Sequence, residues 1–389
     1  MQVYILNEDF EQIAIIDQAD SILWQKKYND VGECEIYLPC DNEALSVLKD
    51  GFYVYRYDDD MLCQIKNIKL ETDVEKGDYL IATAKDICTI LSGRIVWDRI
   101  VYSGSVGGFL KKVLNDNVIN SNQGKRNIPY LTLDEQSFNA ITNEITKETQ
   151  SEDILQLIIS TCKAYNVGFR VSLNLNTKKL VLRLYKGKNK ATMQSDNYIE
   201  FSPTFANIIS SSYEEDSSNY KNYAIVGAKD VDETLMYITV SLDGNEPSGE
   251  NRKEIYVDAT SQSRDVSVEE LLLLYPNATL SGTTYSVTIS GVPISVATVN
   301  DDKVTLTDTA FERLLNVIGI NALIEHQKSH SFNGNVDAID TYEYKTDYDL
   351  GDIVNVINEY GISANALITE VMESKDNENG YEIEPRFEF

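Results

Sequence analysis

The chain has 389 residues, of which 42% are hydrophobic, so it is long and apolar enough to form two or more folded domains. Its formal net charge of −28 argues against a protein that grips DNA or an anionic membrane, because like charges repel at long range. No apolar run approaches the ~18 residues of a membrane helix. The start MQVYILNEDF lacks the basic and apolar regions of a signal peptide.

The charge is unevenly distributed along the chain. Residues 93–200 contain 15 Lys and Arg against 10 Asp and Glu, a net of +5, which leaves −33 for the remainder. Residues 331–389 alone carry 14 acids and 3 bases. We therefore expect a separate, mildly basic unit between strongly acidic flanks.

The cysteines indicate where the protein is made. There are five, an odd number, and none forms a Cys-x-x-Cys pair. This usage is typical of reduced, structural thiols in a chain synthesised in a cytoplasm. They are Cys34, Cys40, Cys63, Cys88 and Cys162.

Residues 1–92 are predicted to be β-structure, since short apolar runs alternate with turn signals such as Asp58-Asp59-Asp60. In the segment GECEIYLP, the side chains of Cys34, Ile36 and Leu38 fall on one face of a strand. The alternation indicates a half-buried strand. The acidic triplet itself is expected to be a solvated hairpin tip, with a divalent-ion site as the alternative.

Residues 93–200 change to helical spacing. The segment SEDILQLIISTCKAYNVG predicts a helix that Ser151 can cap and Gly168 can stop. The following FRVSLNLNTKKLVLRLY predicts a β-hairpin that turns near Asn176-Thr177. We interpret residues 93–200 as an α/β domain inserted between β segments.

The rest of the chain returns to strands with two helical interruptions. Residues 201–260 are predicted to be strand and loop. Ser267 with Glu270, and Thr309 with Glu312, form possible capping boxes ahead of apolar helices. The expected layout is a first β-barrel over 1–92 that 201–228 complete, an inserted α/β domain over 93–200, a second β-barrel over 229–260 and 331–389, and a second inserted α/β segment over 261–330.

Two distant segments, GFYVYRYDDDMLCQIKNIKL and GDIVNVINEYGISANALITEV, follow a similar sequence pattern. Ile65 precedes Gly77 by 12 residues, and Ile368 precedes Gly380 by the same 12. Each copy reads as a three-strand meander with glycine at the first strand and at the second turn. A repeat of this kind predicts two β-barrels of one design in one chain, although unrelated meanders can also share glycines and alternation.

The repeat has a consequence for assembly. Homo-oligomers usually form closed rings, and three chains with two like barrels each would give six similar units with only threefold identity. The hole of such a ring would be lined by the acidic barrels. DNA carries one phosphate charge per ~1.7 Å of axis, so an acidic wall would let it slide.

The sequence resembles the baseplate-hub or tail-tip proteins of tailed bacteriophages, and in particular the siphophage tail proteins with a two-barrel hub. The matching segments span nearly the whole chain in family order. They are Trp24 with Asn29–Pro39, Lys85-Asp86 with Leu91 and Arg94, Arg252–Ala259, Phe332–Gly334, Leu350–Val354 and Ile368–Val371. Residues 261–330 fit the family pattern least well.

The resemblance implies a mainly β, α+β fold with two similar barrels and two inserted α/β domains. It implies a structural virion protein, a homotrimeric hub at the distal end of the tail, that joins tube to tip and surrounds the DNA exit channel. The implied partners are a second and third copy, the distal tail protein, the tail tube, the tape-measure protein and tip or fibre proteins, with DNA only in transit and no stable membrane binding. The implied location is the virion tail tip, after synthesis and assembly in the host cytoplasm.

Candidate chemical sites in the sequence are weak. The two histidines, His326 and His330, have the i, i+4 spacing that places both on one helix face, but a zincin needs His-Glu-x-x-His and here Glu325 precedes the first histidine. A solvated helix end is the interpretation, with a surface metal site as the alternative. The glycine-rich SGSVGGFLKK lacks the P-loop pattern, so a flexible lead-in to a helix is favoured over an anion cradle.

We therefore expect no enzyme activity, no catalytic residue, no cofactor and no metal. Two alternatives to a structural hub stay open: a tail-associated cell-wall hydrolase, and a carbohydrate- or receptor-binding tail module.

Overall fold

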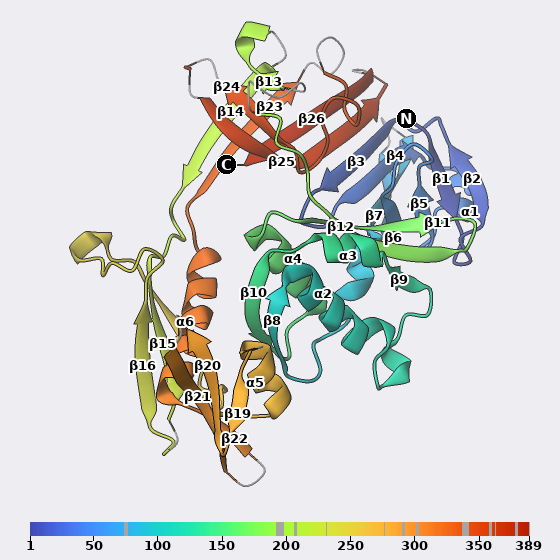
Figure 1. Cartoon of the computed structure of the whole chain (residues 1–389). Helices are drawn as coiled ribbons and strands as arrows, with labels where there is room; N and C mark the ends of the chain where they lie inside the picture. Colours follow the sequence, from blue (N-terminus) through green and yellow to red (C-terminus); the bar gives the residue numbers. More distant parts are fainter. Residues whose placement is uncertain are drawn as a thin grey trace.

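One continuous sheet runs through both ends of the chain. The computed structural model describes residues 1–73, 77–191, 198–205, 208–230, 232–275, 277–289, 292–300, 303–336, 342–357, 360–361, 363–377 and 380–388. The sheet has 13 strands in the order β14-β23-β26-β25-β3-β4-β7-β6-β5-β1-β2, with β24 also paired to β25 and β13 to β24. Helices lie mainly in two other units, so the mainly β, α+β class expected from the sequence is confirmed (Figure 1).

The N-terminal half of this sheet folds from residues 1–86. Its elements are β1 (Val3–Leu6), β2 (Gln12–Ile16), β3 (Ser21–Lys27), β4 (Glu33–Pro39), α1 (Asn42–Val47), β5 (Tyr53–Tyr55), β6 (Leu62–Asp73) and β7 (Gly77–Asp86). Strand β4 buries Cys34, Ile36 and Leu38, as its alternation predicted. These side chains join a core that the inward faces of β1, β6 and β7 complete.

The C-terminal half consists of segments from the last half of the chain. Its elements are β13 (Glu200–Phe201), η4 (Pro203–Phe205), β14 (Ile208–Asp216), β23 (Ser329–Val336), β24 (Ile353–Ile357), β25 (Ser363–Asp376) and β26 (Gly380–Glu388). Strand β25 pairs antiparallel with β3, so that Glu373 lies opposite Trp24. This pairing joins the two halves edge to edge (Figure 1).

The repeated segments form the same meander. Strands β5-β6-β7 and β24-β25-β26 each run in consecutive antiparallel order. Both carry a β-bulge at the matching place, between Ile65 and Asn67 in the first copy and between Ile368 and Glu370 in the second. A bulge bends and twists its strand, so both copies are bent at the equivalent position.

The glycines that open the two meanders are also equivalent. Gly51 has φ +86° and donates its N–H to Ile65 O at 3.0 Å. Gly351 has φ +85° and donates to Ile368 O at 2.8 Å. Because this left-handed conformation disfavours any residue with a Cβ, the backbone geometry explains why glycine occupies both positions. The expectation that the two segments share one design is met at the level of individual hydrogen bonds.

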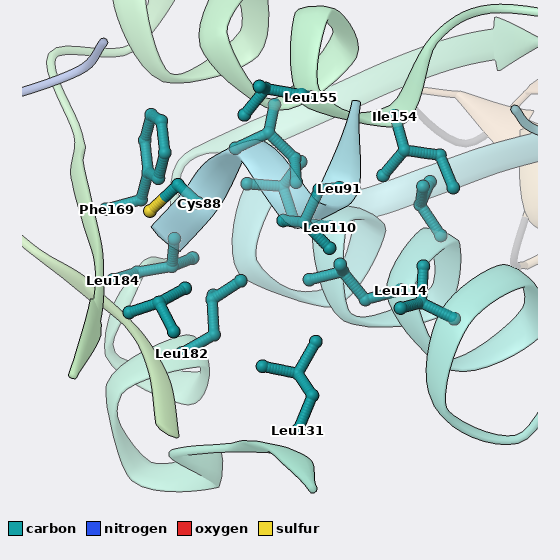
Figure 2. Close-up of a cluster of buried hydrophobic side chains, with 14 of the residues drawn as sticks. Cys88, Leu91, Leu110, Leu114, Leu131, Ile154, Leu155, Phe169, Leu182 and Leu184 are labelled. Carbon is teal, nitrogen blue, oxygen red and sulfur yellow. The ribbon is translucent and has the colours of Figure 1, made fainter. Parts of the chain in front are cut away.

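The basic unit between the halves is α/β. It contains η1 (Ile87–Leu91), β8 (Ile100–Ser105), α2 (Val106–Leu114), the π-helical turn η2 (Asn115–Ile119), η3 (Gly124–Arg126), β9 (Leu131–Leu133), α3 (Glu135–Ala140), β10 (Glu144–Thr149), α4 (Ile154–Ala164), β11 (Gly168–Asn174) and β12 (Lys179–Tyr185). Its core packs Leu110 of α2 and Leu155 of α4 against Phe169 and Leu182 of the hairpin (Figure 2). The same cluster includes Leu6 and Leu62 of the N-terminal half, so these two parts share a core.

Local signals in this unit are partly corrected. The N-cap of α4 is Asp153, whose carboxylate accepts from the N–H of Gln156 at 3.0 Å, and not Ser151. The helix ends at Ala164, and Gly168 starts β11 instead of stopping the helix. The hairpin is confirmed, with Asn174 and Lys179 as the paired residues nearest the turn.

A second helix-containing unit lies at the end of the β14–β23 ladder (Figure 1). It contains β15 (Tyr223–Lys229), β16 (Leu235–Val240), η5 (Gly249–Asn251), β17 (Glu254–Asp258), β18 (Asp265–Val266), α5 (Val268–Leu274), β19 (Thr279–Ser281), β20 (Thr284–Ile289), β21 (Val292–Asn300), β22 (Lys303–Leu306) and α6 (Asp308–Ile324). Its strands form two sheets, β16-β15-β17 and β18-β22-β21-β20-β19, and α6 packs on the first.

The pairing differs from the expected layout in two places. Residues 201–228 were expected to complete the first half, but β13 pairs with β24 and β14 with β23 of the second half. Residues 229–260 were expected in the second barrel, but β16 and β17 flank β15 and share a core with α6. Strand alternation predicts which face of a strand is buried but not which neighbour it pairs with. Helix α6 is capped by Thr307 and not by Thr309.

Candidate functional site: a charged junction

Buried charges gather where the N-terminal half, the α/β unit and the C-terminal half meet. The carboxylates come from the β5–β6 hairpin at Asp58-Asp59-Asp60. The cations come from β3, from the β5–β6 hairpin itself, from the β11–β12 hairpin and from the loop ahead of β24. Around them lies a cavity of about 770 Å³. We call this cluster the charged junction, and its central members are Lys26, Arg56, Asp59, Asp60, Arg170 and Lys345.

Asp59 is the centre of the charged junction. Its side chain is 0% exposed and accepts hydrogen bonds from Lys26 Nζ at 2.9 Å and from Lys345 Nζ at 2.6 Å. The second carboxylate oxygen accepts from the backbone N–H of Met61 at 2.9 Å. Lys345 also donates to Asp58 O at 2.8 Å, so the loop ahead of β24 is fastened to the first hairpin.

Arg170 fastens the α/β unit. Its guanidinium is buried and donates to Asp86 Oδ2 at 3.0 Å and to Lys27 O at 3.1 Å. Asp60 lies 4.0 Å from Arg170 Nε and pairs with Arg183 of β12. The hairpin β11–β12 is therefore tied to three separate segments of the N-terminal half.

Arg56 bridges the two halves directly. Its Nη2 contacts Asp58 Oδ2 at 2.7 Å and Glu373 Oε2 of β25 at 3.0 Å. Its guanidinium lies over the ring of Trp24, 5.3 Å from the centroid, in cation–π geometry. Tyr381 of β26 donates to the same Glu373 oxygen at 2.6 Å. The seam between β3 and β25 is therefore held by ion pairing as well as by the backbone ladder.

The junction keeps its carboxylates ionised at neutral pH. Burial opposes ionisation of Asp59, but the charges of Lys26 and Lys345 prevail and hold its pKa well below the usual range. Burial lowers the pKa of the Lys26 ammonium, but the nearby carboxylate of Asp59 outweighs this effect and the pKa is raised. Asp86 differs, because burial outweighs the attraction of Arg170 and raises its pKa.

These shifts predict how stability depends on pH. A carboxylate whose folded-state pKa is depressed contributes stability above its unfolded pKa of ~3.9 and loses it as pH falls toward the folded value. We expect the stability difference between the native chain and Asp59→Asn, measured by urea unfolding, to be constant from pH 7 to pH 5 and to shrink below about pH 4. The raised pKa of Asp86 has the opposite effect on stability, but it is present in both proteins and so cancels in their difference. A difference that already shrinks above pH 5 would contradict this assignment.

The sequence placed the acidic triplet at a solvated hairpin tip. That expectation is wrong for Asp59 and Asp60, whose carboxylates are paired with Lys26, Arg170 and other cations from distant segments. Only Asp58 is largely exposed, with 68% of its side chain accessible. Residues as far away in sequence as Lys345 cover the tip, and no local pattern carries that information.

The histidine pair is not on one helix face. Helix α6 ends at Ile324, so His326 follows the helix and His330 lies in β23. The imidazole Nδ1 of His326 lies 2.9 Å from Ala322 O in the last turn of the helix. Within the described ranges no group of three or more His, Cys, Asp and Glu side chains is arranged to hold a metal ion.

The glycine-rich segment is a packing feature. Ser105 caps α2 by accepting from the N–H of Gly108 at 3.1 Å. A Cβ at Gly107 would overlap Phe138 O, and one at Gly108 would overlap the hydroxyl of Tyr102. The glycines therefore let α2 approach α3 and β8 closely, rather than making the segment flexible as expected.

The cysteines and helices add two observations. All five cysteines are free thiols, and all but Cys40 are buried. Burial raises the pKa of the Cys34 thiol, so it is protonated at neutral pH. None of the helices in the described part of the chain is long and apolar enough to cross a bilayer.

Sequence reasoning missed the cations of the charged junction. Arg170 lies within the apolar strand GFRVSLN, and a charge inside such a strand indicates a buried pair without identifying the partner. Lys345 has φ +70°, an uncommon conformation for a residue with a side chain, and its sequence context carries no signal. The acids and cations of the junction pair with one another. The arrangement fixes the relative orientation of three parts of the molecule.

Solved structures that resemble this chain include tail proteins. A tail protein from Neisseria meningitidis superimposes with TM-score 0.53 at 11% identity, covering 100% of this chain and 96% of that chain. The prophage tail protein gp18 from Listeria monocytogenes gives a TM-score of 0.48 at 14% identity, and the match covers 100% of this chain and 94% of that protein. The 43 kDa tail protein of prophage MuSo2 from Shewanella oneidensis gives a TM-score of 0.49 at 11% identity. The match covers 100% of this chain and 98% of that protein. The first of these comparisons shows that the chain has the fold of that tail protein.

The sequence then gives the family. Residues 2–387 match the model of the Siphovirus ReqiPepy6 Gp37-like proteins, and the chain belongs to this family. None of the curated proteins compared with the sequence matches it. The chain thus combines membership of a siphovirus family with the fold of a tail protein.

Proposed function

We propose that three copies of the chain form a hub at the distal end of a phage tail, where the trimer joins the tail tube to the tip and surrounds the DNA exit channel. In this role the protein catalyses no reaction. Its partners are further copies of itself, the distal tail protein, the tail tube, the tape-measure protein and tip or fibre proteins. It is assembled in the host cytoplasm and resides at the virion tail tip.

The observation that carries the proposal is the duplicated meander. Strands β5-β6-β7 and β24-β25-β26 share their bulge, their opening glycine and its hydrogen bond. Three chains would present six such meanders around one axis, so a threefold ring could dock on a sixfold tube. The charged junction supports the proposal, because it fixes the two meanders relative to each other within a chain.

The charge distribution favours a channel for DNA in transit. Outside residues 93–200 the chain carries a net −33, and the last 59 residues alone contain 14 acids against 3 bases. An acidic wall repels phosphate and so binds DNA weakly at every position along the channel. The basic α/β unit would then face outward, toward neighbouring tail proteins.

Mass and symmetry test the proposal together. We expect light scattering of the purified full chain to give a mass three times the 43.9 kDa of one copy. Averaged electron-microscope images should show a ring with six similar lobes and a central hole. A monomer at all concentrations, or a closed dimer, would contradict the trimeric hub.

A further inference from the structure

The α/β unit presents an exposed tryptophan beside a cavity. The chain has two tryptophans; Trp24 is 0% exposed in the core, whereas Trp97 is 54% exposed. The cavity beside Trp97 has a volume of about 400 Å³, within the ~300–1,000 Å³ typical of small-ligand pockets. It lies between the start of β8, the π-helical turn η2 and the loop that follows, and Ser267 at the start of α5 also lines it.

Trp97 is held in its exposed position by buried contacts. Its backbone N–H donates to Oδ1 of Asn117 at 2.9 Å. The Asn117 side chain is buried in η2, and its amide donates to Val113 O at 3.0 Å. The guanidinium of Arg126 lies 5.4 Å from the ring centroid and also donates to Ile95 O. The indole is therefore preorganised, and the π-helical turn that holds it is a feature found frequently at functional sites.

The rim of the cavity is rich in amides. The short stretch NDNVINSNQGKRN contains five asparagines and a glutamine. Asn120, Asn122 and Gln123 line the cavity at exposed positions, together with the carboxylate of Asp98. An amide offers two donors and an acceptor on one group, and a carboxylate accepts in two directions. These groups match vicinal hydroxyls, each of which both donates and accepts.

Two of the three cations that line the cavity are already paired with acids, and the third, Arg126, lies over the Trp97 ring. Arg99 pairs with Glu148, with Nη2 and Oε2 at 3.2 Å, and Lys112 pairs with Asp116 at 3.1 Å. At Arg99 and Lys112 a phosphate would therefore have to compete with existing ion pairs, and at Arg126 it would compete with the indole. An aromatic face with a negative quadrupole attracts the C–H edges of a saturated ring as well as cations. A neutral sugar thus fits the site better than a nucleotide.

We propose that the cavity beside Trp97 binds a neutral oligosaccharide, one sugar ring stacking on the indole and its hydroxyls bonding to Asn120, Asn122 and Asp98. This binding site shares no lining residue with the cavity at the charged junction. It would give the α/β unit a direct contact with a glycan-bearing surface.

Fluorescence and a glycan array test the site on the full-length protein. The array of neutral oligosaccharides, with N-acetylglucosamine and glucose oligomers among them, should yield at least one saturable ligand. That ligand should shift tryptophan emission to the blue, because Trp97 is the exposed one of the two tryptophans. We expect Trp97→Ala to weaken binding at least tenfold and Asn122→Ala to weaken it several-fold.

Controls distinguish this site from others. Tyr256, an aromatic side chain 56% exposed on β17, is not part of the cavity lining, so Tyr256→Ala should leave binding unchanged. Circular dichroism should show that all variants keep the native spectrum. The proposal is overturned if no neutral glycan binds, if binding survives Trp97→Ala, or if oligothymidylate saturates the site in place of sugars. Loss of the hub's trimeric mass would bear on the proposed function and not on this site.

Discussion

Replacing Asp59 by Ala is expected to lower the free energy of unfolding by about 3–5 kcal/mol, because Lys345 loses its buried partner and Lys26 keeps only the longer contact with the part-exposed Asp60. Lys26 is itself buried, so water cannot replace the lost carboxylate at that ammonium. Part of the loss should be recovered when Lys345→Ala is added, since the second change removes one of the uncompensated charges. Urea unfolding of the two single variants and the double variant measures these effects.

A surface pair on the same sheet provides the control. Lys69 and Glu71 also form an ion pair, but both side chains are about half exposed. Glu71→Ala should therefore give no measurable change in the urea midpoint. If Asp59→Ala also leaves the free energy of unfolding within about 1 kcal/mol of the native value, the charged junction does not hold the three parts together.

The equivalent glycines should respond differently to the same substitution. At Gly51 a Cβ would meet only Glu8 Oε1, at 3.9 Å, so Gly51→Ala is expected to cost about 1–2 kcal/mol from backbone strain alone. At Gly351 a Cβ would also overlap the ring of Tyr28, at 2.8 Å from Cδ2 and closer still to two other ring atoms. We expect the overlap to add about 1–3 kcal/mol, so Gly351→Ala should be the more destabilising of the two.

Chemical denaturation of the two variants checks this difference, with Gly93→Ala as the matched control. At Gly93 a Cβ would meet no heavy atom within 4 Å, and the backbone there is not left-handed, so this substitution should change stability little. Equal losses at Gly51 and Gly351 would mean that Tyr28 moves aside at no cost. A loss at Gly93 as large as at Gly351 would contradict the strain argument itself.

The Asp59 and Gly351 substitutions also test the proposed hub, because both change how rigidly the two meanders of one chain are held together. The Gly351 variant disturbs the start of the second meander, where Tyr28 of the N-terminal half packs. The Asp59 variant releases the loop before β24 from the first hairpin. Both should loosen the relation between the two meanders, and a ring that matches a sixfold tube requires that relation to be fixed.

The sequence by itself determined the features that depend on local periodicity and turn chemistry. The alternation of β4, the β11–β12 hairpin and the equal spacing from Ile65 to Gly77 and from Ile368 to Gly380 all correspond to observed elements. Side chains alternate every two residues in a strand, and glycine marks left-handed backbone, so these signals are readable within a short window. The sequence predicted helix caps less well. Asp153 and Ser151 are both good N-cap residues, so the pattern alone could not choose between them.

Only the tertiary structure decided which segments meet. It paired β3 with β25 and β14 with β23, and it buried Asp59 under Lys345, a residue 286 positions away. It likewise exposed Trp97 while burying Trp24, two residues with the same intrinsic hydrophobicity. The physical reason is that burial and pairing are properties of the neighbours across a contact. In a sheet built from both ends of a chain, those neighbours lie hundreds of residues apart.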